Sequence, residues 1–98
     1  MDRRLIYSPT TSRALQQIEA YIAQNESQEI AAEYVERIEV RCRRLLLAPE
    51  QGTRQDHFRI GVRTTGFERR VTIAFRVTHN AVRILSIAYG GKRYQADL

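Results

Sequence analysis

The sequence is poor in the residues that build metal centres and disulfide frameworks. It has a single cysteine, Cys42, and two histidines, His57 and His79, with no short-spaced group of metal ligands. A lone cysteine cannot form an internal disulfide, which is typical of proteins in a reducing compartment. We therefore expect no metal and no cofactor, a buried structural role for Cys42, and exposed loop positions for both histidines.

Long apolar runs are missing as well. No stretch approaches the roughly 18 uncharged apolar residues that a membrane-spanning helix requires, and residues 1–4 lack the apolar core of a signal peptide. No glycine-rich phosphate-binding loop precedes a helical pattern. We expect one cytoplasmic domain over residues 1–98, large enough for one modest core.

Charge is present in excess but is unevenly distributed. The net charge is +5; residues 1–57 contain eight basic and nine acidic residues, giving −1, whereas residues 58–98 contain eight basic and two acidic residues, giving +6. A positive field of this kind attracts acidic protein segments or phosphate groups and speeds their association. The alternative is a solvated sheet surface that arginine keeps soluble.

The clearest structural pattern predicts a β-hairpin between residues 68 and 93. Residues 69–77 alternate strictly, which is typical of a half-buried strand. One predicted face carries Val71, Ile73, Phe75 and Val77, and the other carries Arg70, Thr72, Ala74 and Arg76. Residues 78–80 suit a tight turn. Residues 81–89 carry apolar side chains on both faces, with Val82 and Ile84 opposite Leu85, Ile87 and Tyr89, which indicates a central strand.

A short strand over residues 4–7 and two helices, over about 9–24 and 28–47, are expected before the hairpin. Ser8 and Ser27 stand where N-cap residues are needed. Apolar residues of the second helix recur at spacings of four and three, at Ala31, Val35, Ile38, Cys42 and Leu45. The short break between the helices implies an antiparallel helical hairpin.

A polar loop over residues 50–57, a strand over 58–65 and a turn at 65–67 complete the predicted order β-α-α-β-β-β. The predicted fold class is α+β, with the helical hairpin packed on one face of a mainly antiparallel four-stranded sheet. The other face, which no helix covers, would gather arginines from two strands: Arg59, Arg63, Arg70 and Arg76.

An RNA-cleaving enzyme is the catalytic alternative. Cleavage by the 2′-hydroxyl requires a base, an acid and positive charge on the phosphorane. Tyr89, Tyr94 or His79 could move a proton, and the charge could come from Arg70, Arg76, Arg83 or Arg93. However, an unperturbed tyrosine titrates near pH ~10, and His79 lies at the opposite end of the predicted strand from Tyr89. The chemical case for a nuclease is therefore weak.

Taken in order along the chain, these residues resemble the RelE/ParE family of bacterial type II toxins, also known as plasmid stabilisation proteins. The resemblance covers nearly the whole chain and rests on residues 5–9, 21–23, 61–63, 67–77 and 82–91, together with Leu15, Ile18, Pro49 and Gly52. It implies the β-α-α-β-β-β arrangement and a toxin that a cognate antitoxin neutralises.

The resemblance favours the ParE side of this family. ParE-type members inhibit DNA gyrase, whereas RelE-type members cut mRNA in the ribosome. Here the loop before the second strand lacks lysine, and Tyr89-Gly90 stands where many relatives have His-Gly. The resemblance thus implies a gyrase inhibitor that acts by binding. The runner-up is a ribosome-dependent mRNA endoribonuclease that would use Arg70, Arg76, Arg93 and Tyr89. A nucleic-acid-binding module without a toxin role is a third hypothesis.

Two sets of contact residues follow from the pattern and the resemblance. The target is expected to bind the arginine-bearing face and the C-terminal tip, at Arg63, Arg70, Arg76, Arg83, Tyr89, Lys92, Arg93 and Tyr94. The antitoxin is expected to pack on the helical hairpin, at Leu15, Ile18, Ile22, Tyr34, Ile38 and Arg41. Because the second half of the chain is positive, the antitoxin segment should be acidic and amphipathic.

Overall fold

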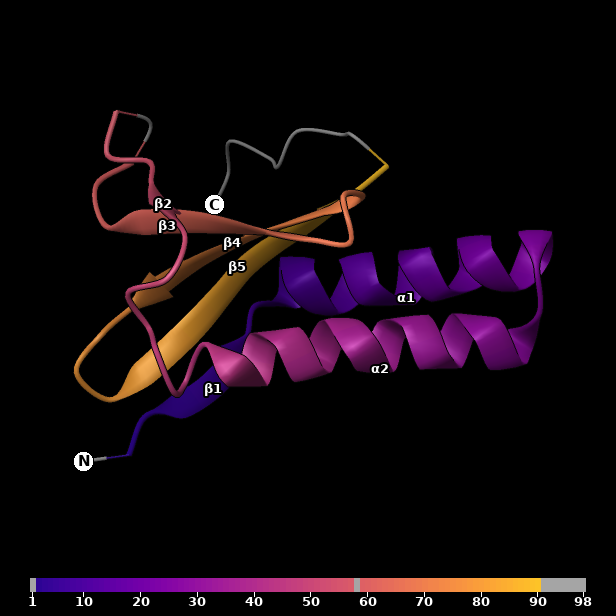
Figure 1. Ribbon diagram of the computed structural model, residues 1–98, viewed down its shortest axis with the longest axis horizontal. Helices are drawn as coiled ribbons and strands as arrows, with labels where there is room; N and C mark the ends of the chain where they lie inside the picture. Colours follow the sequence, from indigo (N-terminus) through magenta and orange to yellow (C-terminus); the bar gives the residue numbers. More distant parts are fainter. Residues whose placement is uncertain (1, 58, 91–98) are drawn as a thin grey trace.

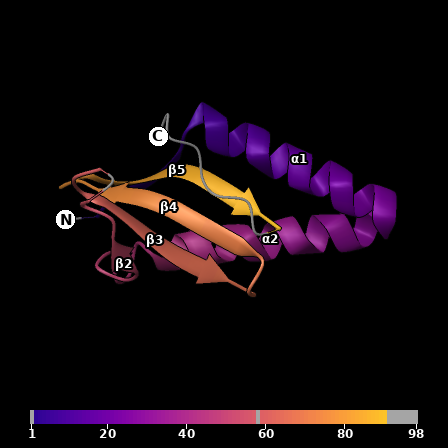
Figure 2. The same ribbon diagram turned by 90° about the horizontal axis from the view of Figure 1, so that it is seen from above.

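Two antiparallel helices lie side by side on one face of a twisted sheet (Figures 1 and 2). The computed structural model describes residues 2–57 and 59–90. In these residues the elements are β1 (Arg4–Tyr7), α1 (Pro9–Asn25), α2 (Gln28–Arg44), β2 (Thr53–Arg54), β3 (Val62–Phe67), β4 (Val71–Val77) and β5 (Ala81–Tyr89). The α+β class and the helical hairpin are confirmed.

The sheet differs from the prediction in strand number and direction. The described residues form five strands in the order β1-β5-β4-β3-β2, and β1 pairs with β5 in parallel. The fifth strand is β2, a two-residue segment of the expected loop that pairs with β3. The expectation of four strands was wrong. A polar two-residue strand shows no alternation of apolar and polar residues, so the sequence pattern could not predict it. β5 lies between β1 and β4, which confirms its central position.

Both helices begin where their serine caps predict. Ser8 Oγ accepts a hydrogen bond from the Thr11 N–H at 3.0 Å, and Ser27 Oγ accepts one from the Ile30 N–H at 3.1 Å. Each serine thereby satisfies an amide that the first helical turn leaves unpaired. α2 ends at Arg44, three residues earlier than expected, because the chain tightens into turns through Leu47. Among the described residues, neither helix is long and apolar enough to cross a membrane.

The turn between β3 and β4 lies three residues later than predicted. β3 continues to Phe67, and the chain reverses through residues 68–70, where Glu68 (φ 48°) and Arg69 (φ 65°) adopt left-handed backbone conformations. Left-handed residues suit a tight hairpin turn, but they are usually glycine or asparagine. The glycine at position 66 therefore suggested the wrong turn, and Phe67 is free to pack against α2.

A β-bulge at Leu85 changes which residues of β5 share a face. Ala74 pairs with Ser86, but its neighbour Phe75 pairs with Ile84, so Leu85 is the extra residue. The bulge shifts the alternation by one position. Val82, Ile84, Ile87 and Tyr89 consequently all face the helices, and the predicted division of β5 into two apolar faces was wrong.

The hydrophobic core lies between the helical hairpin and β1, β4 and β5. The residues that the helices contribute to it are Leu15, Ile18, Ile22, Ala31, Ile38, Cys42 and Leu45. The sheet contributes Val71, Ile73, Phe75, Val82, Ile84 and Ile87. This arrangement leaves the opposite face of the sheet without a helical cover (Figure 2).

Replacing Gly52 with alanine is expected to lower the free energy of unfolding by about 2–4 kcal/mol. Gly52 has φ +82°, and an added Cβ would lie 2.4 Å from the Thr64 carbonyl oxygen of β3. Gly90→Ala is the matched control, since Gly90 has φ +73° but nothing within 4 Å of the added atom. Urea unfolding of both variants measures the difference; equal losses would show that the contact with β3 contributes nothing.

Cys42 is confirmed as a core residue, and its thiol is expected to be unreactive in the folded protein. Its side chain has 0 % exposure, and burial raises the pKa of the thiol to about 12. The thiolate is the reactive form, so little of it is present at pH ~8. We expect Ellman's reagent at pH ~8 to label the native chain at least ~100-fold more slowly than the urea-unfolded chain. Comparable rates would contradict this.

The same pKa shift has a defined effect on stability. A group whose pKa is higher in the folded state stabilises it below the unfolded pKa and loses this contribution as the pH rises. The contribution of Cys42 is therefore complete below about pH 9 and declines as the pH approaches about 12.

Candidate partner-binding surfaces

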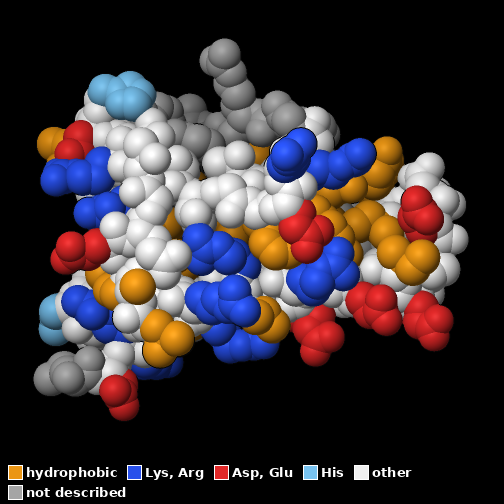
Figure 3. Space-filling model, viewed as in Figure 1, with side chains coloured by type: hydrophobic (Ala, Val, Ile, Leu, Met, Phe, Trp, Pro, Cys, Tyr) orange, Lys and Arg blue, Asp and Glu red, His pale blue; other side chains and the backbone are white. Residues whose placement is uncertain are grey.

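The predicted arginine-bearing face does not form a single surface. Arg63 pairs with Phe75, whose side chain lies in the core, so Arg63 faces the helical side of the sheet. Arg63 was therefore assigned to the wrong face, because the apolar residues that alternate with it, Ile60 and Val62, were taken to face the helices, whereas Val62 pairs with Arg76 on the opposite face. Arg76 and Arg83 do lie on the face opposite the helices, directly across from each other. Figure 3 shows basic side chains in several separate groups.

Arg70 lies in the turn before β4 and not on a strand face. Arg76 lies six positions after Arg70 along an extended segment, a distance of about 20 Å. The target-binding residues predicted on the sheet are thus divided between its two ends. The remaining predicted ones, Lys92, Arg93 and Tyr94, lie outside the described residues.

Three arginines on the helical side make side-chain contacts within the protein itself. The Arg37 guanidinium forms a two-point ion pair with Glu68, with Nε–Oε2 at 3.0 Å and Nη2–Oε1 at 3.2 Å. Arg41 donates to Thr65 Oγ1 at 2.7 Å, and Arg63 donates to the Glu50 carbonyl at 2.9 Å. These contacts join α2 to β3 and to the left-handed turn, and join β3 to the loop after α2. We therefore assign these arginines a structural role.

Four aromatic rings cluster at the end of the sheet near this turn, and we call them the aromatic end: Tyr21, Tyr34, Phe67 and Tyr89. Tyr34 contacts both Phe67 and Tyr89 edge-on, and Tyr89 contacts Tyr21, each with ring centroids 5.9 Å apart. Edge-to-face pairs of this kind stabilise by about 0.5–1.5 kcal/mol beyond burial. Tyr21 remains 55 % exposed.

Two basic residues border the aromatic end. The Arg37 guanidinium carbon lies 5.1 Å from the Tyr34 ring centroid, within the range of a cation–π contact. The Arg70 carbonyl accepts a hydrogen bond from the Gly90 N–H at 2.8 Å, which holds the turn beside the end of β5. Tyr34 and Tyr89, predicted to contact different partners, are therefore neighbours on one surface.

The aliphatic residues predicted to contact the antitoxin lie in the core. Leu15, Ile18, Ile22 and Ile38 are between 0 % and 8 % exposed, so they have little surface to offer a partner in this fold. Tyr34 is partly exposed, and Arg41 is hydrogen-bonded to Thr65. The exposed large apolar side chains of the same helices are Tyr21 and Ile30, the latter 48 % exposed.

The proton-transfer candidates within the described residues are far apart. His79 lies in the exposed turn before β5, whereas Tyr89 is the last residue of that strand. Strand geometry places them roughly 25 Å apart. Tyr94 lies outside the described residues. Over residues 2–57 and 59–90, no three histidine, cysteine, aspartate or glutamate side chains are grouped so that they could hold a metal ion.

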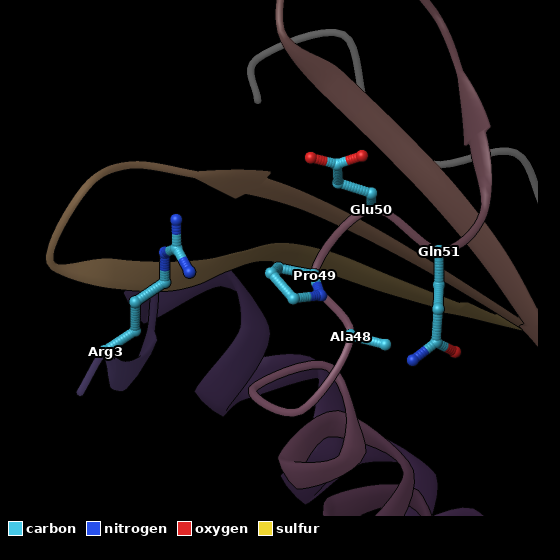
Figure 4. A pocket seen from close by; sticks show the side chains of 5 residues that line it. All are labelled: Arg3, Ala48, Pro49, Glu50 and Gln51. Carbon is cyan, nitrogen blue, oxygen red and sulfur yellow. The ribbon is translucent and has the colours of Figure 1, made fainter. Parts of the chain in front are cut away.

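A shallow open pocket lies between the start of β1 and the loop after α2 (Figure 4). Its lining residues are Arg3, Ala48, Pro49, Glu50 and Gln51. Arg3 Nε donates to the Thr78 carbonyl at 2.8 Å, so its guanidinium joins β1 to the β4–β5 turn. No candidate acid–base pair lines this pocket, and we assign it no chemical role.

Comparison with known proteins decides the family. A model of the ParE toxin of type II toxin–antitoxin systems, from the parDE system, matches residues 5–94. The chain belongs to the ParE toxin family. Among solved structures, a chain of the chromosomal ParDE toxin–antitoxin system from P. aeruginosa matches with a TM-score of 0.78 and 25 % sequence identity, over 89 % of this chain and 95 % of that chain. A search of curated proteins found no match.

The ParE-family chain thus contains surface features that sequence reasoning missed. The aromatic end joins Tyr21 of α1 to Phe67 of β3, and the Arg37–Glu68 ion pair lies beside it. Tyr21 was predicted to lie in the first helix with no role of its own, and Phe67 was predicted to lie in a turn. Helical spacing shows which residues share a helix face, but not which of them extends past the end of the sheet.

Proposed function

We propose that this toxin of a type II toxin–antitoxin system inhibits DNA gyrase by binding to it, in the cytoplasm. The observation that carries the proposal is the family match over residues 5–94, because gyrase inhibition is the role of ParE toxins. The roughly 25 Å between His79 and Tyr89 supports binding over RNA cleavage, since general acid–base chemistry requires both groups within hydrogen-bond reach of one substrate.

The aromatic end and Arg70 are the proposed contact surface for gyrase. Tyrosine and arginine are the residue types that dominate the binding energy of protein interfaces. Tyr21 is exposed, Tyr89 lies beside it, and Arg70 is exposed in the adjoining turn. Lys92, Arg93 and Tyr94 follow Gly90 in the sequence and remain proposed contacts that lie outside the described residues.

Two assays on the same pure protein test the proposal. One measures supercoiling of relaxed plasmid by gyrase, and the other measures cleavage of mRNA on translating ribosomes. We expect loss of supercoiling with intact mRNA. Intact supercoiling with cleaved mRNA would support the RelE-type endoribonuclease instead, and would refute the proposed target.

The partner of this toxin is an antitoxin, as the similarity to a ParDE structure supports. We propose that an acidic, amphipathic antitoxin segment crosses the exposed ends of the helices, where Tyr21 and Ile30 offer apolar surface. Arg37 and Arg70 lie close to this path. Opposite charges steer association, so its rate should fall as salt increases. Stopped-flow mixing with the antitoxin encoded beside this toxin measures it; a rate independent of salt would remove the electrostatic part of the proposal.

A further inference from the structure

Three arginines share one corner of the sheet face that carries no helix, and we call Arg4, Arg76 and Arg83 the arginine corner. Arg76 of β4 and Arg83 of β5 are directly paired across the two strands. Arg4 lies on the same face of the neighbouring β1, since Leu5 beside it pairs with the core residue Val82. The corner lies at the opposite end of β4 from the aromatic end.

Like charges placed directly across a strand pair repel each other and destabilise the pairing. Two arginines elsewhere in the described residues form ion pairs, Arg37 with Glu68 and Arg54 with Asp56. Within the described residues, no carboxylate forms an ion pair with any of the three corner arginines. An anionic ligand would therefore lower the electrostatic cost of the corner.

One of the corner arginines is held in place by the backbone. Arg76 Nη2 donates to the Ile60 carbonyl at 3.1 Å, which uses one N–H and fixes the guanidinium over the sheet. Arg83 is exposed, and neither it nor Arg4 makes a side-chain hydrogen bond within the part of the chain that the structure describes. The corner thus combines one positioned guanidinium with two that are available to a ligand.

The neighbouring side chains indicate the kind of anion. On β3 this face continues with Thr64, whose hydroxyl, like a guanidinium group, is a common donor to phosphate oxygens. A protein partner requires large apolar anchors at the centre of its contact. Among the described residues the corner has two large apolar side chains, the partly exposed Ile6 and, at its rim, Ile60, which is 81 % exposed, and neither is aromatic. This composition favours a phosphate backbone over an acidic peptide.

The reachable area is small. Towards the middle of the same face, Ala74 is 0 % and Ser86 is 3 % exposed, so a ligand contacts the corner and not the whole face. Three arginines can neutralise about three phosphates, for which the logarithm of the binding constant changes with the logarithm of salt concentration by about −2.7. Binding by the toxin alone is therefore weak and strongly salt-dependent.

We propose that the arginine corner contacts the phosphate backbone of duplex DNA. The contact is separate from the aromatic end, so a toxin bound to its protein target through one end of β4 could touch DNA with the other. This inference goes beyond the proposed function. It requires no gyrase for its test and would stand if the target proved to be another protein.

The test is an NMR titration of the full-length, ¹⁵N-labelled toxin with a 12-base-pair DNA duplex, followed by fluorescence anisotropy from 50 to 200 mM salt. We expect the largest shifts in the Nε–H signals of Arg4, Arg76 and Arg83. The Arg4→Gln/Arg83→Gln double variant should bind about tenfold more weakly, with a salt slope smaller by about 1.8. Arg13→Gln is the control, because Arg13 is an exposed arginine of α1 that forms no side-chain hydrogen bond or ion pair with the described residues.

Three outcomes would overturn the proposal. In the first, the double variant and the unmodified chain bind the duplex equally. In the second, the shifts appear on the helical layer. In the third, a poly-glutamate peptide of the same charge binds the corner at least as tightly as the duplex. Because the titration of the unmodified chain maps the contact directly, the result does not depend on whether the variants fold. The gyrase assay is independent of it, so failure of either proposal is distinguishable from failure of the other.

Discussion

Phe75→Ala is expected to lower the free energy of unfolding by about 3–5 kcal/mol. Among the described residues Phe75 is the largest fully buried side chain, with 0 % exposure, and it lies in β4 between β3 and β5. Its removal leaves a cavity that neither sheet neighbour can fill, because both backbones are fixed by the strand ladder. A loss of this size is a large part of the ~5–15 kcal/mol that stabilises an ordinary domain.

Urea unfolding, followed by circular dichroism, measures the loss of Phe75. Val77→Ala is the matched control in the same strand and on the same face, because Val77 is only partly buried at the strand end. The control should cost about 1 kcal/mol. Equal costs at the two positions would show that the core is not centred on β4.

Arg70→Ala is expected to abolish growth arrest and to weaken inhibition of gyrase supercoiling at least ~30-fold, a cost of about 2 kcal/mol. Arg70 is exposed beside the aromatic end, and its side chain makes no hydrogen bond within the described residues. Its loss should leave folding intact, because the contact that holds the turn uses the Arg70 backbone carbonyl. Growth after induction and a supercoiling titration measure the two effects.

Two controls make the Arg70 result specific. Arg13→Ala removes the same charge from the outer surface of α1 and should leave toxicity unchanged. Near-native circular dichroism of the Arg70 variant excludes unfolding as the cause. Full toxicity of a folded Arg70→Ala protein would show that gyrase is not contacted at this turn, and would direct attention to other surfaces.

Local patterns predicted most of the elements. The two serine caps predicted the helix starts, because an N-cap satisfies backbone amides of its own first turn. Strict alternation predicted β4, whose apolar set faces the helices as expected. Each of these features depends on residues that are close to each other in the sequence. The resemblance of the whole chain to RelE/ParE toxins was confirmed by the match over residues 5–94.

The errors concern features that depend on contacts between distant residues. The bulge at Leu85 places Ile84 and Ile87 on one face, because a pairing strand can accept one extra residue without any local signal. The turn formed at Glu68 and Arg69, where Phe67 packs on Tyr34 and the Arg37–Glu68 ion pair holds a strained backbone. The alternation of residues along a single strand predicts neither the bulge in the strand pairing nor the contacts that hold the turn.

The sequence alone determined the class of fold, the helical hairpin, the buried state of Cys42 and the positive charge of the second half, because these depend on local spacing and composition. Only the tertiary structure decided where that charge lies. It divided the arginines between the aromatic end, the α2–β3 contacts and the corner of Arg4, Arg76 and Arg83. The physical reason is strand register: a shift of one residue moves every side chain to the other face, and register is set by contacts across the sheet.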